Sequence, residues 1–213
     1  MPFFIDPGKY EVVDLSMEVT PNHMPADRPF DIKEGRLPDN TWKFDIVNTH
    51  THVGTHIESP WHFYGHGRTC TDYPLNKFMG PALRIQPAPG PEADQVEAAA
   101  LRHLLEPRRG AFRNLLIHNA AGRKPLRFSM ECAEYLAELR LDMLIFEPAT
   151  EFGQGIEDGR RFHDLLMSND TLLVEFPGDL TGLTQDEFYV FAMPLRVKGL
   201  DSSPCRLFAI IEK

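Results

Sequence analysis

The chain has 213 residues with a formal net charge of −9 at pH 7, and apolar residues make up 42% of it. This length suits one globular domain, expected here over residues 1–213, with an ordinary composition for a folded protein. The acidic balance argues against a nucleic-acid partner, because affinity for a phosphate backbone depends on clustered Lys and Arg side chains.

Cysteine usage and the lack of long apolar runs bear on the compartment. Cys70, Cys132 and Cys205 lie far apart and form neither a disulfide framework nor a Cys-x-x-Cys metal motif, which favours a reducing environment. No run approaches the roughly 20 apolar residues of a membrane span. Asp6 and Pro7 interrupt the apolar N-terminus before a signal-peptide core can form. We therefore expect a cytoplasmic protein with no membrane partner.

Strands dominate the expected secondary structure. Residues 42–48 alternate apolar and polar side chains, the period of a half-buried strand. Further strands are expected at residues 10–15, 82–85, 114–118, 143–146, 172–176, 187–193 and 207–211. The stretch 86–95 (QPAPGPEADQ) is linker-like but too short to divide domains.

Helices are fewer. One is expected at residues 94–105 and a short one at 161–167. A third begins near Ser129, which can cap the helix, and has one apolar face formed by Cys132, Ala133, Leu136 and Leu139. This helix lies between the strands at 114–118 and 143–146, so the three form a strand–helix–strand unit.

Histidines concentrate in one segment. Five of the nine lie between His50 and His66, around the run His-Thr-His-Val-Gly-Thr-His-Ile-Glu-Ser-Pro-Trp-His. Imidazole and carboxylate groups at close spacing are ligands for Zn²⁺, Mn²⁺ and Fe²⁺. In extended backbone His56 and Glu58 would aim together, since residues two apart share a face.

The residues around this pair support a shared site. Gly54 permits a bend or bulge that would bring His52 to the same point. Pro60 is expected to keep the chain extended and to block a helix, with His62 following at the rim. The segment favours a metal site over a set of independent surface or core histidines.

This run resembles the hallmark His-x-Gly-Thr-His-x-Asp-x-Pro-x-His of the cyclase-type metal-dependent hydrolases, a group that includes bacterial kynurenine formamidases and isatin hydrolases. It stands here as His52-Val-Gly-Thr-His56-Ile-Glu58-Ser-Pro60-Trp-His62. His163 and Glu175, twelve residues later, match a late metal-ligand pair of the family. Further similar segments are Asp14-Leu15-Ser16, Tyr73-Pro74-Leu75, Met79-Gly80-Pro81-Ala82 and Gly199-Leu200-Asp201-Ser202-Ser203-Pro204.

The resemblance implies a mixed α/β fold, the family's swivelling β/β/α domain, with a strand-rich core and long loops, assembled as a homodimer or homotetramer. It implies hydrolysis of a small-molecule amide, lactam, lactone or ester, with His62 as proton carrier. One or two divalent metals, Zn or Mn, would be bound. His52, His56 and Glu58 would hold the first, and Glu58 would bridge to a second completed by His163 and Glu175.

The position of Glu175 in the sequence also supports a partner for its carboxylate, independently of the resemblance. It ends the apolar run Leu-Leu-Val-Glu, where a buried carboxylate requires a metal or a basic neighbour. If its side chain faces solvent instead, no such partner is required.

Several positions depart from the family pattern. Glu58 stands where the family has Asp and is one methylene longer, so the number of bound metals stays open. The loop at 18–25 lacks the substrate-stacking aromatic residue of kynurenine formamidases; His23 or Met24 lines the pocket instead, or both are ordinary loop residues. The segment Leu-Ile-Phe-Glu-Pro at 144–148 replaces a Gly-Ile-Asp segment, and His118-Asn119 replaces an Arg-Thr pair. A substrate other than formylkynurenine is therefore favoured.

Two alternatives remain at this stage. A cupin-type metal enzyme would use His50, His52 and Glu58, although the spacing to Glu58 is longer than the cupin pattern. A non-catalytic or weakened metal-binding member of the same fold would keep the ligands without needing His62.

Overall fold

A closed sheet forms the centre of the molecule, in a computed structural model that describes residues 6–90, 94–120 and 124–213. The strands run in the order β1-β12-β11-β5-β6-β8-β10-β4, and β4 pairs with β12 as well as with β10, which closes the sheet on itself. Their bounds are β1 Tyr10–Asp14, β4 His56–Glu58, β5 Met79–Ile85, β6 Asn114–Ile117, β8 Met143–Phe146, β10 Leu172–Glu175, β11 Glu187–Pro194 and β12 Ser202–Glu212.

The four central strands are parallel. β5, β6, β8 and β10 pair in this way, and β8, buried on both faces, is a continuous apolar run. Leu115 and Leu144 face the helices, whereas Leu116 and Ile145 belong to a second core on the other face of the sheet. Alternation along each strand thus fills two cores from one short segment.

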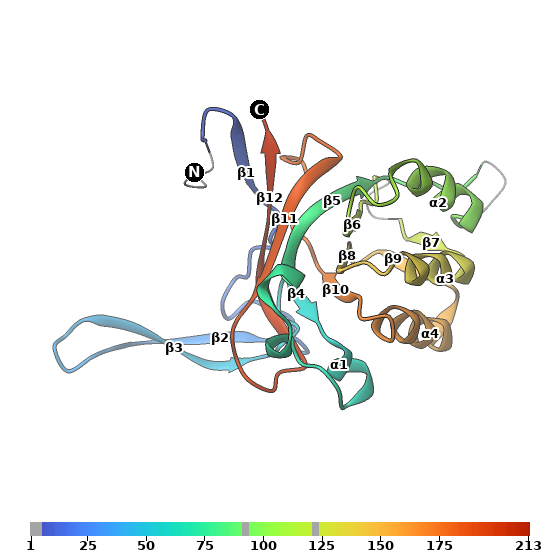
Figure 1. Ribbon diagram of the computed structural model, residues 1–213. Helices are drawn as coiled ribbons and strands as arrows, with labels where there is room; N and C mark the ends of the chain where they lie inside the picture. The colour runs from blue at the N-terminus through green and yellow to red at the C-terminus, as the bar shows by residue number, and fades with distance from the viewer. Residues whose placement is uncertain (1–5, 91–93, 121–123) are drawn as a thin grey trace.

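Three helices cover one face of the sheet. They are α2 (Ala98–Leu105), α3 (Met130–Leu139) and α4 (Gly155–Met167), and they stack beside one another in Figure 1. Small parallel strands β7 (Leu126–Phe128) and β9 (Thr150–Phe152) lie near them. The remaining short helices are α1 Pro60–Tyr64, η1 Cys70–Asp72, η2 Leu75–Phe78 and η3 Glu106–Arg108.

The mixed, strand-rich α/β architecture expected from the sequence is confirmed, and so is the unit in which α3 joins the parallel strands β6 and β8. All eight expected strands are present, β8 with identical bounds. Residues 1–5 of the N-terminal segment and 91–93 of the linker-like stretch lie outside the described residues. No helix in the described part of the chain combines the length and apolar character that a membrane crossing requires.

One strand differs from its expected environment. Residues 42–48 fall in β3 (Trp42–Thr49), which pairs only with β2 (Phe30–Arg36) in a hairpin that projects from the body (Figure 1). Trp42, Phe44 and Ile46 are 57%, 61% and 60% exposed. The expectation of a half-buried strand is wrong because no core layer of the described chain packs against these side chains; the Arg36 guanidinium lies over Trp42.

Helix ends also differ. The helix expected from residue 94 begins at Ala98, because Val96 forms an isolated bridge with Phe128 of β7. α4 begins at Gly155, six residues before the expected start. Ser129 occupies the N-cap position of α3, but its side chain makes no cap hydrogen bond.

Candidate metal centre

β4 carries two of the expected ligands on one short, buried strand. His56 and Glu58 are 0% and 3% exposed, and His56 Nε2 lies 3.5 Å from Glu58 Oε1. Neighbouring strands fix both edges of β4, since Glu175 of β10 stands opposite His56 and Ser202 of β12 stands opposite Glu58. The period-two geometry expected for this pair is present.

The turn before β4 brings His52 to the same carboxylate. Gly54 has a φ of +60°, and an added Cβ would lie 2.5 Å from Val19 Cγ2, so glycine satisfies both the backbone and the space. Its carbonyl accepts a hydrogen bond from His56 Nδ1 at 2.9 Å. His52 Nδ1 lies 2.9 Å from Glu58 Oε1.

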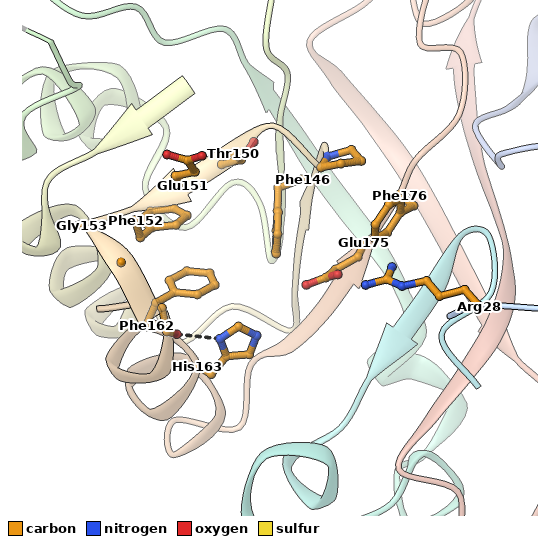
Figure 2. A pocket seen from close by; sticks show the side chains of 13 residues that line it. Arg28, Phe146, Thr150, Glu151, Phe152, Gly153, Phe162, His163, Glu175 and Phe176 are labelled. Carbon is orange, nitrogen blue, oxygen red and sulfur yellow. Dashed lines mark hydrogen bonds between the residues drawn. The ribbon is translucent and has the colours of Figure 1, made fainter. Parts of the chain in front are cut away.

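Two further groups approach from α4 and β10. His163 Nε2 lies 3.8 Å from Glu58 Oε2, and Glu175 Oε2 lies 3.8 Å from His56 Nε2. His163 Nδ1 donates to the Gly159 carbonyl at 2.7 Å, drawn as the dashed line in Figure 2, which leaves Nε2 as the free nitrogen. The Glu175 side chain is thus mostly buried beside an imidazole, and it does not face solvent.

Glu58 belongs to two donor groups. The ligand atoms of His52, His56 and Glu58 lie within 4.8 Å of one another, and so do those of Glu58, His163 and Glu175. His56 Nε2 and Glu58 Oε2 are buried without a hydrogen-bond partner, an arrangement that is costly unless another ligand satisfies them. Three imidazoles and two carboxylates with such orphaned atoms fit a divalent metal of the Zn or Mn type.

The two carboxyl groups have opposite electrostatics. Burial acts to raise the pKa of Glu58, but the hydrogen bond from His52 and the close imidazoles of His56 and His62 outweigh it and hold that pKa far below its usual value. Burial raises the pKa of Glu175, and the charge of Glu58 raises it further. Without a bound cation, Glu175 thus tends to keep its proton; a cation between the two would favour ionisation of both.

His62 lies at the edge of this group and is held by a residue that the sequence did not single out. Asp201 Oδ2 accepts hydrogen bonds from His62 Nδ1 at 3.0 Å and from His52 Nε2 at 3.1 Å. His62 Nε2 faces Glu58 Oε1 at 3.7 Å, and its side chain is 35% exposed. His62 therefore reaches both the donor group and solvent.

The sequence indicated Asp201 only as part of a segment that resembles the family, without a role of its own. It directly precedes Ser202, the residue opposite Glu58 in the β4–β12 pairing. Burial acts to raise its pKa, but hydrogen bonds from His62 and His52 outweigh this and lower the pKa to about 2. The Gly-Leu-Asp-Ser-Ser-Pro motif indicated that this segment resembles the family. It did not indicate a contact with His62, which lies 139 residues away in the sequence.

Pro60 has a different role from the expected one. It begins helix α1, at the position where its fixed φ and missing N–H are tolerated. The expectation that Pro60 blocks a helix is therefore wrong, and α1 is what carries His62 back over Glu58.

A cavity of about 500 Å³ adjoins the donor groups. His163 and Glu175 line it on one side, and Figure 2 shows phenylalanine rings around it: Phe146, Phe152, Phe162 and Phe176. Neither His23 nor Met24 is among the described residues that line it; Arg28, a few positions later in the same loop, is.

The residues after β6 and β8 that depart from the family pattern contact each other. His118 Nδ1 lies 2.9 Å from Glu147 Oε2, and the Asn119 backbone N–H donates to the same oxygen at 2.5 Å. None of the three lines the cavity. Two departures from the family pattern thus form one link between the ends of neighbouring strands.

Comparisons with known proteins identify the family of this chain. The family model described as "Putative cyclase" matches residues 13–149, more than half of the chain. The kynurenine formamidase of Paracidovorax citrulli (strain AAC00-1) is 27% identical over 168 residues, which cover 73% of this chain and 74% of that protein.

Solved structures share the fold. Isatin hydrolase A from Labrenzia aggregata, bound to benzyl benzoate, has a TM-score of 0.75 at 18% identity, covering 96% of this chain and 94% of that one. A protein described as a potential metal-dependent hydrolase with cyclase activity has a TM-score of 0.72 at 19% identity, covering 94% and 98%. The chain belongs to the cyclase-type metal-dependent hydrolase family and is an enzyme.

Proposed function

We propose that this chain hydrolyses a small amide, lactam, lactone or ester at a centre for one or two divalent ions, Zn or Mn. The ligands would be His52, His56, Glu58, His163 and Glu175. The observation that carries the proposal is the convergence of two donor groups on Glu58, with buried atoms of His56 and Glu58 left unsatisfied. The kynurenine formamidase relative supports hydrolysis of an amide-like bond.

A metal held there would supply Lewis acidity and lower the pKa of a water molecule toward neutrality. His62 would accept the proton of the attacking water and deliver it to the leaving nitrogen or oxygen. Asp201 orients His62 by holding Nδ1, so that Nε2 is the nitrogen that faces the centre. The half-exposed position of His62 also allows proton exchange with solvent.

The fold argues against one of the two alternative functions, and an experiment at His62 tests the other. The parallel strands β5, β6, β8 and β10 argue against a cupin, whose double-sheet jelly roll is antiparallel. A non-catalytic metal-binding protein would not require His62, so replacement of that residue separates it from the enzyme.

The test is metal content per chain by elemental analysis, combined with a hydrolysis screen over formamides, lactams and lactones. The proteins are wild type, His56→Ala, His62→Gln and, as a control, His103→Ala, whose histidine lies on α2 away from the donor groups. Thermal melting of each variant checks folding.

Wild type and His103→Ala are expected to bind one or two equivalents of Zn or Mn, and His56→Ala to lose metal while remaining folded. His62→Gln should keep the metal and lose roughly 10²- to 10⁴-fold in kcat, the usual contribution of a general acid–base. Absence of metal uptake by folded wild type would refute the proposal. Full activity of His62→Gln would remove His62 from the mechanism.

A further inference from the structure

Arg28 occupies a place in the cavity that the hydrolytic centre leaves unexplained. Its guanidinium lies over the Phe176 ring, with Cζ 4.4 Å from the ring centroid, and Nη1 is buried without a hydrogen-bond partner. Figure 2 shows the group pointing toward Glu175, and its charge acts to lower the pKa of that carboxyl, but no ion pair within 4.0 Å joins the two side chains. A buried guanidinium nitrogen without an acceptor is costly, so an external acceptor would satisfy it.

The platform beneath Arg28 is held firmly. Phe176 has a φ of +56°, a conformation that non-glycine residues adopt at a cost and that often marks ligand sites. Its carbonyl accepts a hydrogen bond from Thr55 Oγ1 at 2.6 Å. The ring also stacks on His56, with centroids 5.7 Å apart. Phe176 therefore connects the position of Arg28 to β4 and the donor groups.

The rest of the cavity suits a flat, apolar body. Four phenylalanines line it, and its volume of about 500 Å³ is within the range for small-molecule sites. Thr150 Oγ1, also on the wall, is a second buried polar atom without a partner. One end of a ligand would thus meet aromatic rings and another a fixed cation.

We propose that the substrate carries a carboxylate, bound by Arg28, on an aromatic or similarly flat body packed among the phenylalanine rings. The planar fork of guanidinium donors matches a carboxylate better than any neutral acceptor. This inference rests on the proposed hydrolytic function and adds the substrate class to it.

The test compares charged and neutral substrates of one shape. The 2-, 3- and 4-formamidobenzoates are assayed against the matching formamidobenzamides with zinc-loaded wild type, Arg28→Gln and Arg28→Lys. Arg36→Gln is the matched control, because Arg36 also stacks on an aromatic ring, Trp42, but on the projecting hairpin. Binding of benzoate and benzamide, measured by calorimetry, gives a readout that does not require turnover.

Wild type and Arg36→Gln are expected to prefer at least one formamidobenzoate over its amide through a lower KM. Arg28→Gln should lose about 10- to 100-fold in affinity for benzoate and in kcat/KM for that carboxylate, the usual effect of one charge-assisted contact. Its values for the neutral amides should fall much less than those for the carboxylates, and Arg28→Lys should restore part of the preference. Metal content must be equal in all proteins.

Two outcomes would overturn the inference. Equal activity of wild type on the charged and neutral partners, with equal benzoate binding by wild type and Arg28→Gln, would exclude a carboxylate site. An equal fall in kcat on both partners in Arg28→Gln would instead assign Arg28 to the reaction centre. If wild type hydrolyses none of the formamides but binds benzoate through Arg28, the carboxylate site stands and this reaction does not.

Discussion

Asp201 shows how one side chain connects a proposed metal ligand, His52, to the proposed proton carrier, His62. Its Oδ2 accepts from His52 and from His62, which orients both rings so that His52 Nδ1 and His62 Nε2 face Glu58. Partners of this kind commonly change activity or metal affinity 10- to 100-fold when they are removed. In the proposed mechanism Asp201 is therefore a positioning residue rather than a catalytic one.

We expect Asp201→Asn to lower kcat about 10- to 100-fold with little change in KM and to weaken metal binding. An amide can donate to the rings as well as accept, so the tautomer of His62 is no longer fixed. Steady-state kinetics at saturating metal and a metal titration measure the two effects. Asp170→Asn, which alters a carboxylate bound to Tyr73 and Arg68 instead, is the control. Unchanged kcat in Asp201→Asn would show that His62 needs no such partner.

The pKa of Asp201 also makes a prediction for the metal-free protein. A folded-state pKa of about 2, below the usual 3.8, stabilises the fold fully above pH 3.8 and progressively less as pH falls toward 2. Urea unfolding should therefore show a deficit in Asp201→Asn that is full at about pH 5–6, where His52 with its raised pKa is still charged, and that shrinks below pH 4.

At the element scale, β4 has only three residues, yet it holds the site together because both of its edges are paired. Its direction is set by the turn at Gly54. The sequence predicted this bend from glycine alone, without revealing that Val19 closes the space beside it. The contact with Val19 could not be read from the sequence, since it joins the first loop to the metal-site turn.

Gly54→Ala is expected to destabilise the protein by about 1–3 kcal/mol, because the new Cβ combines a positive φ with a clash at 2.5 Å. Gly65→Ala is the matched control: its φ is +68°, but nothing lies within 4 Å of an added Cβ. Urea unfolding of both variants separates backbone strain from the clash. Equal losses in the two would mean that Val19 moves aside freely.

The hairpin β2–β3 marks where pattern reasoning fails at this scale. Alternation in residues 42–48 identified a strand correctly. Burial, however, depends on which layer packs against the strand, and no sequence pattern states that the hairpin leaves the body. Helix starts failed for a related reason: Val96 bridges β7 through a tertiary pairing that local propensity does not contain.

At the scale of the whole molecule, the sequence predicted the mixed fold and the residues that lie together in the donor groups. It did not predict the order of the strands that bring them together. Parallel central strands could be anticipated from continuous apolar runs such as that of β8. Closure of the sheet through the β4–β12 pairing could not, because it joins residues 56–58 to residues 202–204. That same closure is what places Asp201 beside His62. The homodimer or homotetramer, the substrate and the metal stay predictions.

Metal binding should stabilise the whole fold, since the expected ligands come from the turn before β4, from β4 itself, from α4 and from β10. Metal at about 100 times its Kd adds about 2.7 kcal/mol, or roughly 5–10 °C in Tm for a chain of this size. Scanning calorimetry with and without a chelator measures the shift. An unchanged Tm after chelation would contradict a bound ion.

The chelated protein should in addition respond to pH through Glu175. Its folded pKa is raised by burial and by Glu58, so the stability it contributes is complete below about 4.5 and is lost as pH rises through the folded value. As pH rises above about 4.5, chelated wild type should therefore lose stability through this carboxyl group. Chelated Glu175→Gln should not, because the amide carries no charge. Metal-loaded wild type should also lack this slope, since a bound cation favours the ionised carboxylate. If the stability of chelated Glu175→Gln still falls as pH rises, the titrating group is another one, and the repulsion expected between Glu58 and Glu175 is absent.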